Sequence, residues 1–129
     1  MIRVVVDASA MAAIFFQEEG FEQVVHRLKG ASLHAPDLLR AELTNVAVKK
    51  ARRNPRTSPE LFERLAEGVG RLKQVRWHDV QPTDVAVLAS LTGLSAYDAT
   101  YLWLAGWLGA DLVTLDRRLL AVQGMPVEA

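Results

Sequence analysis

The chain of 129 residues contains no cysteine, which excludes disulfide scaffolds, thiolate metal sites and thiol nucleophiles. No apolar run approaches the ~20 residues that a transmembrane helix needs, so we expect no membrane span. Glycine is sparse, and Gly68-Val69-Gly70 does not continue into a nucleotide-binding fingerprint. The short apolar N-terminus is interrupted by Asp7 and does not match a secretory signal. We therefore expect a protein of the cytoplasm.

The formal net charge is zero, so the whole-chain balance indicates no general attraction to nucleic acid. The basic residues nevertheless gather between Lys49 and Arg76, where nine of them accompany three acidic residues. This segment is either a solvated helix pair with a basic loop or a rim that binds phosphate groups. Charge alone leaves both interpretations open.

Length and an apolar content of 50% predict one domain spanning residues 1–129. The sequence pattern predicts strands at 2–6, 32–35, 75–77 and 111–115, with a possible edge strand at 126–128. It predicts helices at 8–16, 21–28, 36–53, 58–73, 83–91, 95–108 and 116–124, with Thr83 or Asp84 capping the fifth. This alternation favours an α/β fold with three layers (α/β/α) around a parallel sheet of four or five strands. The very apolar helical segment 101–108 is either core or an interface with a partner.

Four acidic residues occupy positions at which ligands bind in such a sheet. Asp7 and Asp116 directly follow strands, and ligands bind outside the carboxyl ends of parallel strands. Asp98 and Glu42 lie in the first halves of two helices. Each acid has a structural explanation of its own: Asp7 and Asp116 suit N-caps, Asp98 completes a capping-box pattern with Ser95, and Glu42 suits a solvated helix surface.

The four acids taken together favour a metal site. Asp98 and Asp116 lie within apolar segments, where an unpaired charge is costly. With neither cysteine nor paired histidines, the expected cation is Mg²⁺, with Mn²⁺ as a substitute. Such an ion lowers the pKa of bound water and offsets charge on phosphate oxygens. Four carboxylates are compatible with either one ion or two.

The motifs VVVDASA, AELTNV, SAYDATYLWLA and LVTLDRRLL, in this order and spacing, resemble those of PIN-domain ribonucleases, in particular the VapC-type toxins of toxin–antitoxin pairs. The resemblance spans essentially the whole chain and implies a metal-dependent endoribonuclease, an RNA substrate, a cognate antitoxin protein and a homodimer. It assigns the metal-binding and catalytic roles to Asp7, Glu42, Asp98 and Asp116. It assigns supporting roles to Ser9, Asn45 and Thr114. Arg52, Arg53 and Arg56, which follow the Glu42 helix, are the candidates for holding the RNA backbone.

Three other functions fit this sequence less well. A phosphatase with an aspartyl nucleophile would need an acid two residues after Asp7, where Ser9 stands. A Ser-His-Asp hydrolase would need a G-x-S-x-G turn, which the chain lacks. The remaining alternative is a catalytically inactive PIN-like module that binds RNA or protein, and the presence of all four acids counts against it.

Overall fold

The computed structural model of the chain describes residues 1–123. Its strands are β1 (Arg3–Val6), β2 (Ser32–Pro36), β3 (Arg76–His78) and β4 (Asp111–Val113). Its α-helices are α1 (Ala8–Phe15), α2 (Phe21–Leu28), α3 (Leu38–Arg53), α4 (Ser58–Arg71), α5 (Pro82–Thr92), α6 (Ala96–Leu108) and α7 (Arg117–Val122). The 3₁₀ turns η1 (Pro55–Thr57) and η2 (Leu72–Gln74) flank α4.

The four described strands form one parallel sheet in the order β3-β2-β1-β4. In the central strand β1, Val5 lies opposite His34 of β2 and Leu112 of β4. Val5 and Leu112 are completely buried, as expected for parallel strands that are covered on both faces. All four carboxyl ends therefore meet at one edge of the sheet.

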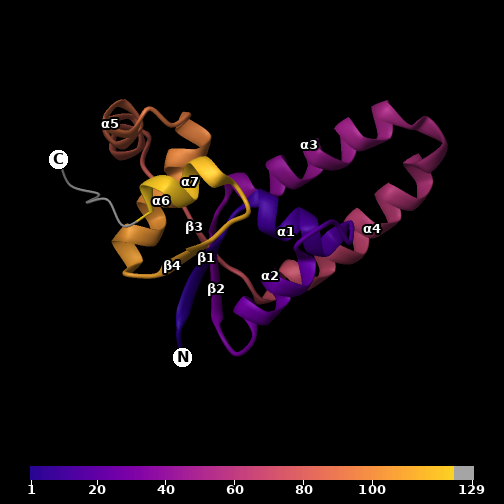
Figure 1. Cartoon of the computed structure of the whole chain (residues 1–129), viewed down its shortest axis with the longest axis horizontal. Helices are drawn as coiled ribbons and strands as arrows, with labels where there is room; N and C mark the ends of the chain where they lie inside the picture. The colour runs from indigo at the N-terminus through magenta and orange to yellow at the C-terminus, as the bar shows by residue number, and fades with distance from the viewer. Residues whose placement is uncertain (124–129) are drawn as a thin grey trace.

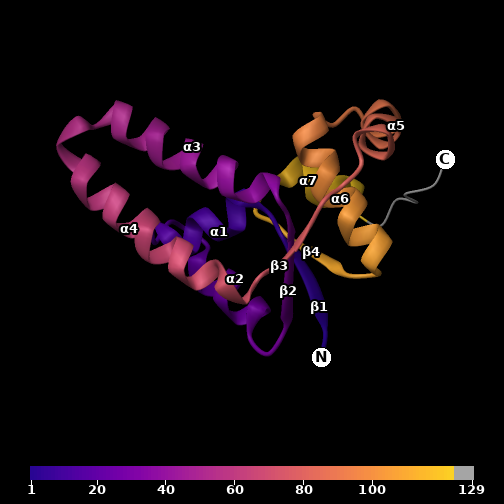
Figure 2. The ribbon, with the colours of Figure 1, turned by 180° about the vertical axis from the view of Figure 1, so that it is seen from behind.

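Helices cover both faces of the sheet (Figure 1). On one face, α6 packs against β1, β2 and β4, and α5 packs against α6. On the other side lie α1 and α3, with α4 packed against both of them, as the view from behind also shows (Figure 2). The predicted three-layer α/β/α arrangement with a parallel sheet is confirmed.

The helices α3 and α4 form a long pair that extends beyond the sheet, with η1 at its tip (Figure 1). α4 reaches α1 closely because it presents Gly68 to the ring of Phe15. A Cβ atom at Gly68 would lie 2.4 Å from the nearest ring atoms. Nearer the tip, Lys50 of α3 forms an ion pair with Glu18, which follows α1.

Strand β4 ends at Val113, two residues earlier than the predicted end at Leu115. The backbone leaves the sheet because its next N–H groups donate to side chains. The N–H of Leu115 donates to Ser9 Oγ at 2.9 Å, and that of Asp116 donates to Thr114 Oγ1 at 3.0 Å. Hydroxyl groups that belong to the candidate site thus end the strand.

The predicted caps of the fifth helix were wrong, because α5 begins at Pro82 and has Gln81 as its N-cap. Proline is favoured in the first helical turn, where its missing N–H is not needed. The end of α4 also differs, since the helix stops at Arg71 and η2 replaces the predicted last residues. β3 consequently begins at Arg76, one residue later than predicted.

The predicted edge strand at 126–128 and the predicted helix end at Gly124 lie outside the described residues. Among residues 1–123, no helix has both the length and the hydropathy that crossing a bilayer would require.

Candidate active site

The carboxyl ends of β1 and β4 each lead into an aspartate that caps the next helix. Asp7 accepts a hydrogen bond from the N–H of Ala10 at 3.0 Å, and Asp116 accepts one from the N–H of Arg118 at 2.8 Å. The two strands are neighbours, with Val6 opposite Val113, so the aspartates project from adjacent strand ends. Both residues therefore serve as N-caps. Because each directly follows a strand of the parallel sheet, both also lie at the carboxyl edge of that sheet.

Hydroxyl groups bind both oxygens of the buried Asp7 carboxylate. The hydroxyl of Ser9 donates to Oδ1 at 2.7 Å, and the hydroxyl of Thr114 donates to Oδ2. Burial raises the pKa of Asp7, the three hydrogen bonds to Thr114, Ala10 and Ser9 oppose that shift, and the charge of Asp116 adds to it. Ser9 and Thr114, the predicted supporting residues, thus hold Asp7 in a single orientation.

Glu42 reaches the site from α3 and meets a buried tyrosine of α6. The hydroxyl of Tyr101 donates to Glu42 Oε1 at 2.5 Å, and only 1% of Tyr101 is exposed. Burial raises the pKa of Glu42, the hydrogen bond from Tyr101 lowers it, and the charges of Asp98 and Asp7 raise it. Burial together with the adjacent Glu42 also raises the pKa of Tyr101, so the phenol keeps its proton and remains a donor.

Asp98 lies in the first turn of α6, opposite the start of α7. The Oγ of Ser95 accepts a hydrogen bond from the N–H of Asp98 at 3.1 Å, which is the N-cap half of the predicted capping box. Burial raises the pKa of Asp98, the charge of Asp116 adds to the shift, and Arg118 and Ser95 oppose it. The guanidinium of Arg118 lies 3.6 Å from Asp98 Oδ2 and 3.5 Å from Asp116 Oδ2.

These interactions connect the four predicted acids into one electrostatic group. Asp116 raises the pKa of both Asp7 and Asp98, while Asp98 and Asp7 raise the pKa of Glu42. Like charges act on one another in this way only at short range in a partly buried site. The fold therefore brings together side chains from the β1–α1 junction, α3, α6 and the β4–α7 turn.

The donor set is suited to a hard divalent cation, because it consists of carboxylate and hydroxyl oxygens. Burial raises the pKa of Asp7, Glu42 and Asp98, and repulsion between the carboxylates adds to the shift; a cation would relieve that repulsion. Within residues 1–123, however, no three His, Asp or Glu side chains are arranged so that they could hold a metal ion. Arg118 places a positive charge near two of the carboxylates, those of Asp98 and Asp116.

Sequence reasoning missed two residues of this site, Tyr101 and Arg118. Tyr101 lies three residues after Asp98, in a helix segment so apolar that its hydroxyl needs a buried partner. The buried hydroxyl indicated that a partner was needed, but the partner, Glu42, lies 59 residues away in the chain. Arg118 follows Asp116 by two residues, but its ion pair with Asp98 joins residues that are 20 positions apart in the chain.

The other predicted residues lie farther from the carboxylates. Asn45 is exposed one turn after Glu42 on α3, and no hydrogen bond of its side chain is found within the described part of the chain. Arg52, Arg53 and Arg56 are exposed at the tip of the α3–α4 pair. Ten helical residues separate Glu42 from Arg52, which corresponds to about 15 Å along the α3 axis.

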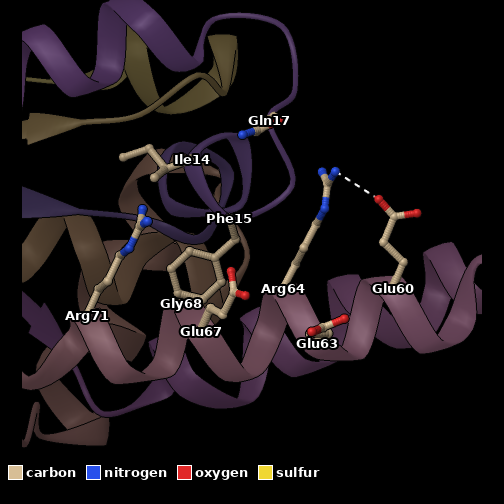
Figure 3. A pocket seen from close by; sticks show the side chains of 9 residues that line it. All are labelled: Ile14, Phe15, Gln17, Glu60, Glu63, Arg64, Glu67, Gly68 and Arg71. Atoms are coloured by element: carbon tan, nitrogen blue, oxygen red, sulfur yellow. Dashed lines mark hydrogen bonds and ion pairs between the residues drawn. The ribbon is translucent and has the colours of Figure 1, made fainter.

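A separate pocket of about 370 Å³ lies between α1 and α4 (Figure 3). Ile14 and Phe15 provide apolar surface on the α1 side. α4 provides alternating charges, with Arg64 bound to Glu60 at 2.9 Å. The α4 residues that line it are Glu60, Glu63, Arg64, Glu67, Gly68 and Arg71.

Comparisons with known proteins agree with this architecture. Residues 4–125 match the family model described as PIN domain. The chain is 37% identical over 121 residues to Ribonuclease VapC3 of Pyrobaculum aerophilum, covering 92% of both proteins. It is 31% identical over 123 residues to Ribonuclease VapC9 of Mycobacterium tuberculosis, covering 90% of this chain and 87% of that protein.

A solved structure is similar over nearly the whole chain. The crystal structure of PAE2754 from Pyrobaculum aerophilum has 28% sequence identity and a TM-score of 0.76, and the match covers 97% of this chain and 82% of that one. The match therefore extends well beyond the four acidic positions. The chain belongs to the PIN-domain family and, within it, to the VapC ribonucleases.

Proposed function

We propose that the chain is a metal-dependent endoribonuclease that hydrolyses RNA phosphodiester bonds, and that it is the toxin of a toxin–antitoxin pair. The observation that carries the proposal is the convergence of Asp7, Glu42, Asp98 and Asp116 at the carboxyl edge of the sheet. Similarity to VapC ribonucleases supports the RNA substrate. The inactive-module alternative is not favoured, because all four acids are present and their charges act on one another.

The four carboxylates would hold Mg²⁺, for which Mn²⁺ is the expected substitute. Such an ion, when bound, supplies an activated water and offsets the charge on the phosphate oxygens. Ser9 and Thr114 fix the two oxygens of Asp7, so one ligand is oriented before binding. Tyr101 does the same for one oxygen of Glu42 and leaves the second oxygen available.

The basic tip of the α3–α4 pair is proposed to hold the RNA backbone. Arg52, Arg53 and Arg56 are exposed there, whereas Lys50 is paired with Glu18 and Arg64 with Glu60. Their exposed guanidinium groups suit contacts with phosphate, and their position at the tip supports the proposal.

Cleavage of a mixed RNA pool by the purified chain tests the main proposal. The reactions contain Mg²⁺, Mn²⁺ or EDTA, and compare wild type with Asp7→Asn and with the control Asp111→Asn. Asp111 is an exposed aspartate at the start of β4, the opposite end of the sheet from Asp7. We expect metal-dependent cleavage by wild type and Asp111→Asn only. A folded wild type that binds neither ion and cuts no RNA would instead support the binding module.

The antitoxin is proposed to dock at the pocket between α1 and α4 shown in Figure 3. Three glutamates and two arginines line it, and Arg64 is paired with Glu60, so Glu63 and Glu67 leave a small excess of negative charge. A protein segment with apolar and basic side chains would fit Ile14 and these glutamates. Expression of the toxin should stop growth, and the product of the adjacent gene should relieve this arrest. Glu63→Lys should weaken that relief without changing cleavage of RNA.

A homodimer is proposed through the exposed end of α6. Trp107 is 63% exposed and stacks on Trp103 at 5.9 Å between ring centroids, which leaves a large aromatic surface in contact with water. Trp107→Lys should therefore convert a dimer into a monomer in sedimentation analysis.

We further propose that the protein acts in the cytoplasm, where its RNA substrate is found.

A further inference from the structure

A pocket of about 330 Å³ lies at the same edge of the sheet as the four carboxylates. Its rim includes Asp37, which follows β2, and Asp79, which follows β3. Those strands are the next two beyond β1 in the sheet. Since neighbouring strands are about 5 Å apart, the pocket lies about 5–10 Å from the strand that leads to Asp7.

The first turn of α6 joins this pocket to the carboxylate site. Ala96, Tyr97 and Thr100 line the pocket, while Asp98, between them in the sequence, faces Asp116 and Arg118. If a bound RNA has one phosphate at the carboxylates and continues along the edge of the sheet, its next nucleotide would therefore reach the pocket.

The composition of the pocket disfavours a phosphate group as its occupant. Its apolar walls are formed by Pro36, Leu38, Val80, Pro82, Val85 and Ala86. Among residues 1–123, no lysine or arginine lines it, and its charged or titratable side chains are Asp37, Asp79 and His78. An uncharged, flat group that carries N–H donors fits this surface, because the walls are apolar and the carboxylates accept hydrogen bonds.

Two side chains at the rim have no other evident role in the fold. Tyr97 is 62% exposed, although it is a large aromatic residue in the first turn of a helix. Asp37 occupies the N-cap position of α3, yet its side chain makes no capping hydrogen bond. An exposed aromatic ring and an available carboxylate are the groups with which proteins stack and read unpaired RNA bases.

We propose that this pocket binds one unpaired base of the RNA next to the bond that is cut, with Tyr97 stacking on the base and Asp37 accepting hydrogen bonds from its edge. The inference rests on the ribonuclease function proposed above. Guanine is the expected base, since it alone presents two adjacent donors, N1–H and the 2-amino group, to the two oxygens of one carboxylate. The pocket thereby sets which sites in an RNA are cut.

Mapping of cleavage sites in a random single-stranded RNA pool tests this role. Wild type should cut at sites that share guanine at one fixed position beside the cut. Tyr97→Ala should lower the rate at those sites by about 5-fold to about 150-fold, the range expected for loss of one stacked base, and Asp37→Asn should abolish the preference for guanine. Tyr97→Phe retains the ring and should therefore keep the preference for guanine that Tyr97→Ala weakens. Phe62→Ala removes a comparably exposed aromatic residue from α4 and is the matched control.

Titration with nucleotides measures binding at the pocket independently of RNA cleavage. Guanosine and uridine 5′-monophosphate carry the same phosphate, so a difference between them reports the base. In NMR spectra of the full chain, the guanine nucleotide should shift the amide signals of Asp37 and Tyr97 at lower concentration than the uracil nucleotide. Tyr97→Ala should remove this difference.

The outcomes separate the two proposals. If wild type cuts RNA without a shared base, or if Tyr97→Ala keeps the wild-type pattern, the base pocket is overturned and the ribonuclease stands. If no RNA is cut but the guanine nucleotide binds preferentially through Tyr97, the base pocket stands and the ribonuclease falls. If Tyr97→Ala weakens only the binding of the antitoxin and leaves RNA cleavage unchanged, the pocket is a protein contact and the proposal is overturned.

Discussion

Individual side chains of the candidate site combine a structural role with a chemical one. Asp7 and Asp116 cap helices, and the same carboxylates repel other acids across the edge of the sheet. The structural interpretation of each acid and its proposed catalytic role are therefore not alternatives. The two roles can be separated experimentally, because a cap contributes to the free energy of unfolding while a metal ligand contributes to cleavage.

Asp98→Asn is expected to abolish cleavage while the melting temperature stays the same or rises. The pKa of Asp98 is raised by burial and by Asp116, so its negative charge at neutral pH destabilises the folded state. Thermal unfolding and a cleavage assay measure both effects. Ser95→Ala is the control, since loss of this N-cap should cost about 0.5–2 kcal/mol without abolishing cleavage. A drop in stability of Asp98→Asn as large as that of Ser95→Ala would instead assign Asp98 to capping.

Tyr101→Phe should reduce metal-dependent cleavage by about 10-fold to about 100-fold, the usual effect of losing a group that orients a metal ligand. The hydroxyl lies 2.5 Å from Glu42 Oε1, so its removal frees that carboxylate to rotate. The rate should recover in part at higher metal concentration, which a titration with Mn²⁺ would show. Tyr97→Phe changes a tyrosine of the same helix that is exposed, and should leave the metal dependence unaltered. Equal metal titrations for the two variants would contradict the orienting role.

At the scale of helices and strands, the contacts between elements depend on a few close approaches. α4 lies on α1 because Gly68 leaves room for the ring of Phe15, and β2 is joined to β3 by side chains as well as by backbone. His34 of β2 and His78 of β3 form a hydrogen bond of 2.8 Å between Nδ1 and Nε2. Both features have measurable consequences for stability.

Gly68→Ala should destabilise the fold by about 1–3 kcal/mol, the usual cost of overpacking. The added methyl group would lie 2.4 Å from the Phe15 ring, so the helix or the ring must move. Gly70→Ala provides the control on the same helix, since a Cβ atom there meets nothing within 4 Å. That variant should be stabilised by about 0.5–1 kcal/mol, because alanine favours the helix. Urea unfolding of both would show opposite signs, and equal signs would contradict the packing argument.

The free energy of unfolding should fall as the pH decreases below about 6.5 because of His34. Burial lowers the pKa of His34 in the folded protein from its ordinary value of 6.5, and the charges of His78, Arg76 and Arg3 add to the shift. The unfolded chain then takes up a proton at a higher pH than the folded one. This contribution is complete above pH 6.5 and is lost towards the lower folded pKa, with a slope of at most about 1.4 kcal/mol per pH unit.

Comparison of wild type with His34→Gln isolates this contribution from that of the carboxylates, whose raised pKa values act in the opposite direction. Urea unfolding between pH 7.5 and pH 5 should give a smaller loss for His34→Gln than for wild type. His26→Gln, which changes an exposed histidine of α2, should keep the wild-type profile. Parallel profiles for wild type and His34→Gln would show that His34 does not titrate differently on unfolding.

At the scale of the whole molecule, charge is distributed unevenly although the sum is zero. Acidic side chains converge at the carboxyl edge of the sheet, while basic side chains lie along and beyond α3. A protein that cuts RNA needs both regions, because carboxylates that bind a cation repel phosphate before the cation is bound. The uneven distribution is consistent with the proposal that one region attracts the RNA and the other holds the ion.

Replacement of Arg52, Arg53 and Arg56 by glutamine should weaken binding of single-stranded RNA and reduce its salt dependence. If each guanidinium neutralises one phosphate, the slope of log K against log salt should decrease in magnitude by about 2. Fluorescence anisotropy with a labelled RNA at several salt concentrations gives this slope. Arg27→Gln, an exposed arginine on α2, should not change it. An unchanged slope in the triple variant would show that the arginines at the tip of the α3–α4 pair do not bind RNA phosphates.

The sequence by itself determined the α/β class, the order of the elements and the four acids, because these depend on local patterns of hydropathy and on residues at strand ends. It could not assign the hydrogen bond from Thr114 to Asp7, the partner of Tyr101 or the ion pair between Arg118 and Asp98, since each joins groups distant in the chain. Tertiary structure alone decided that β2 and β3 end beside the carboxylates, which places Asp37 and Tyr97 at one pocket. The physical reason is that sheet order and helix packing, rather than spacing along the chain, decide which side chains meet.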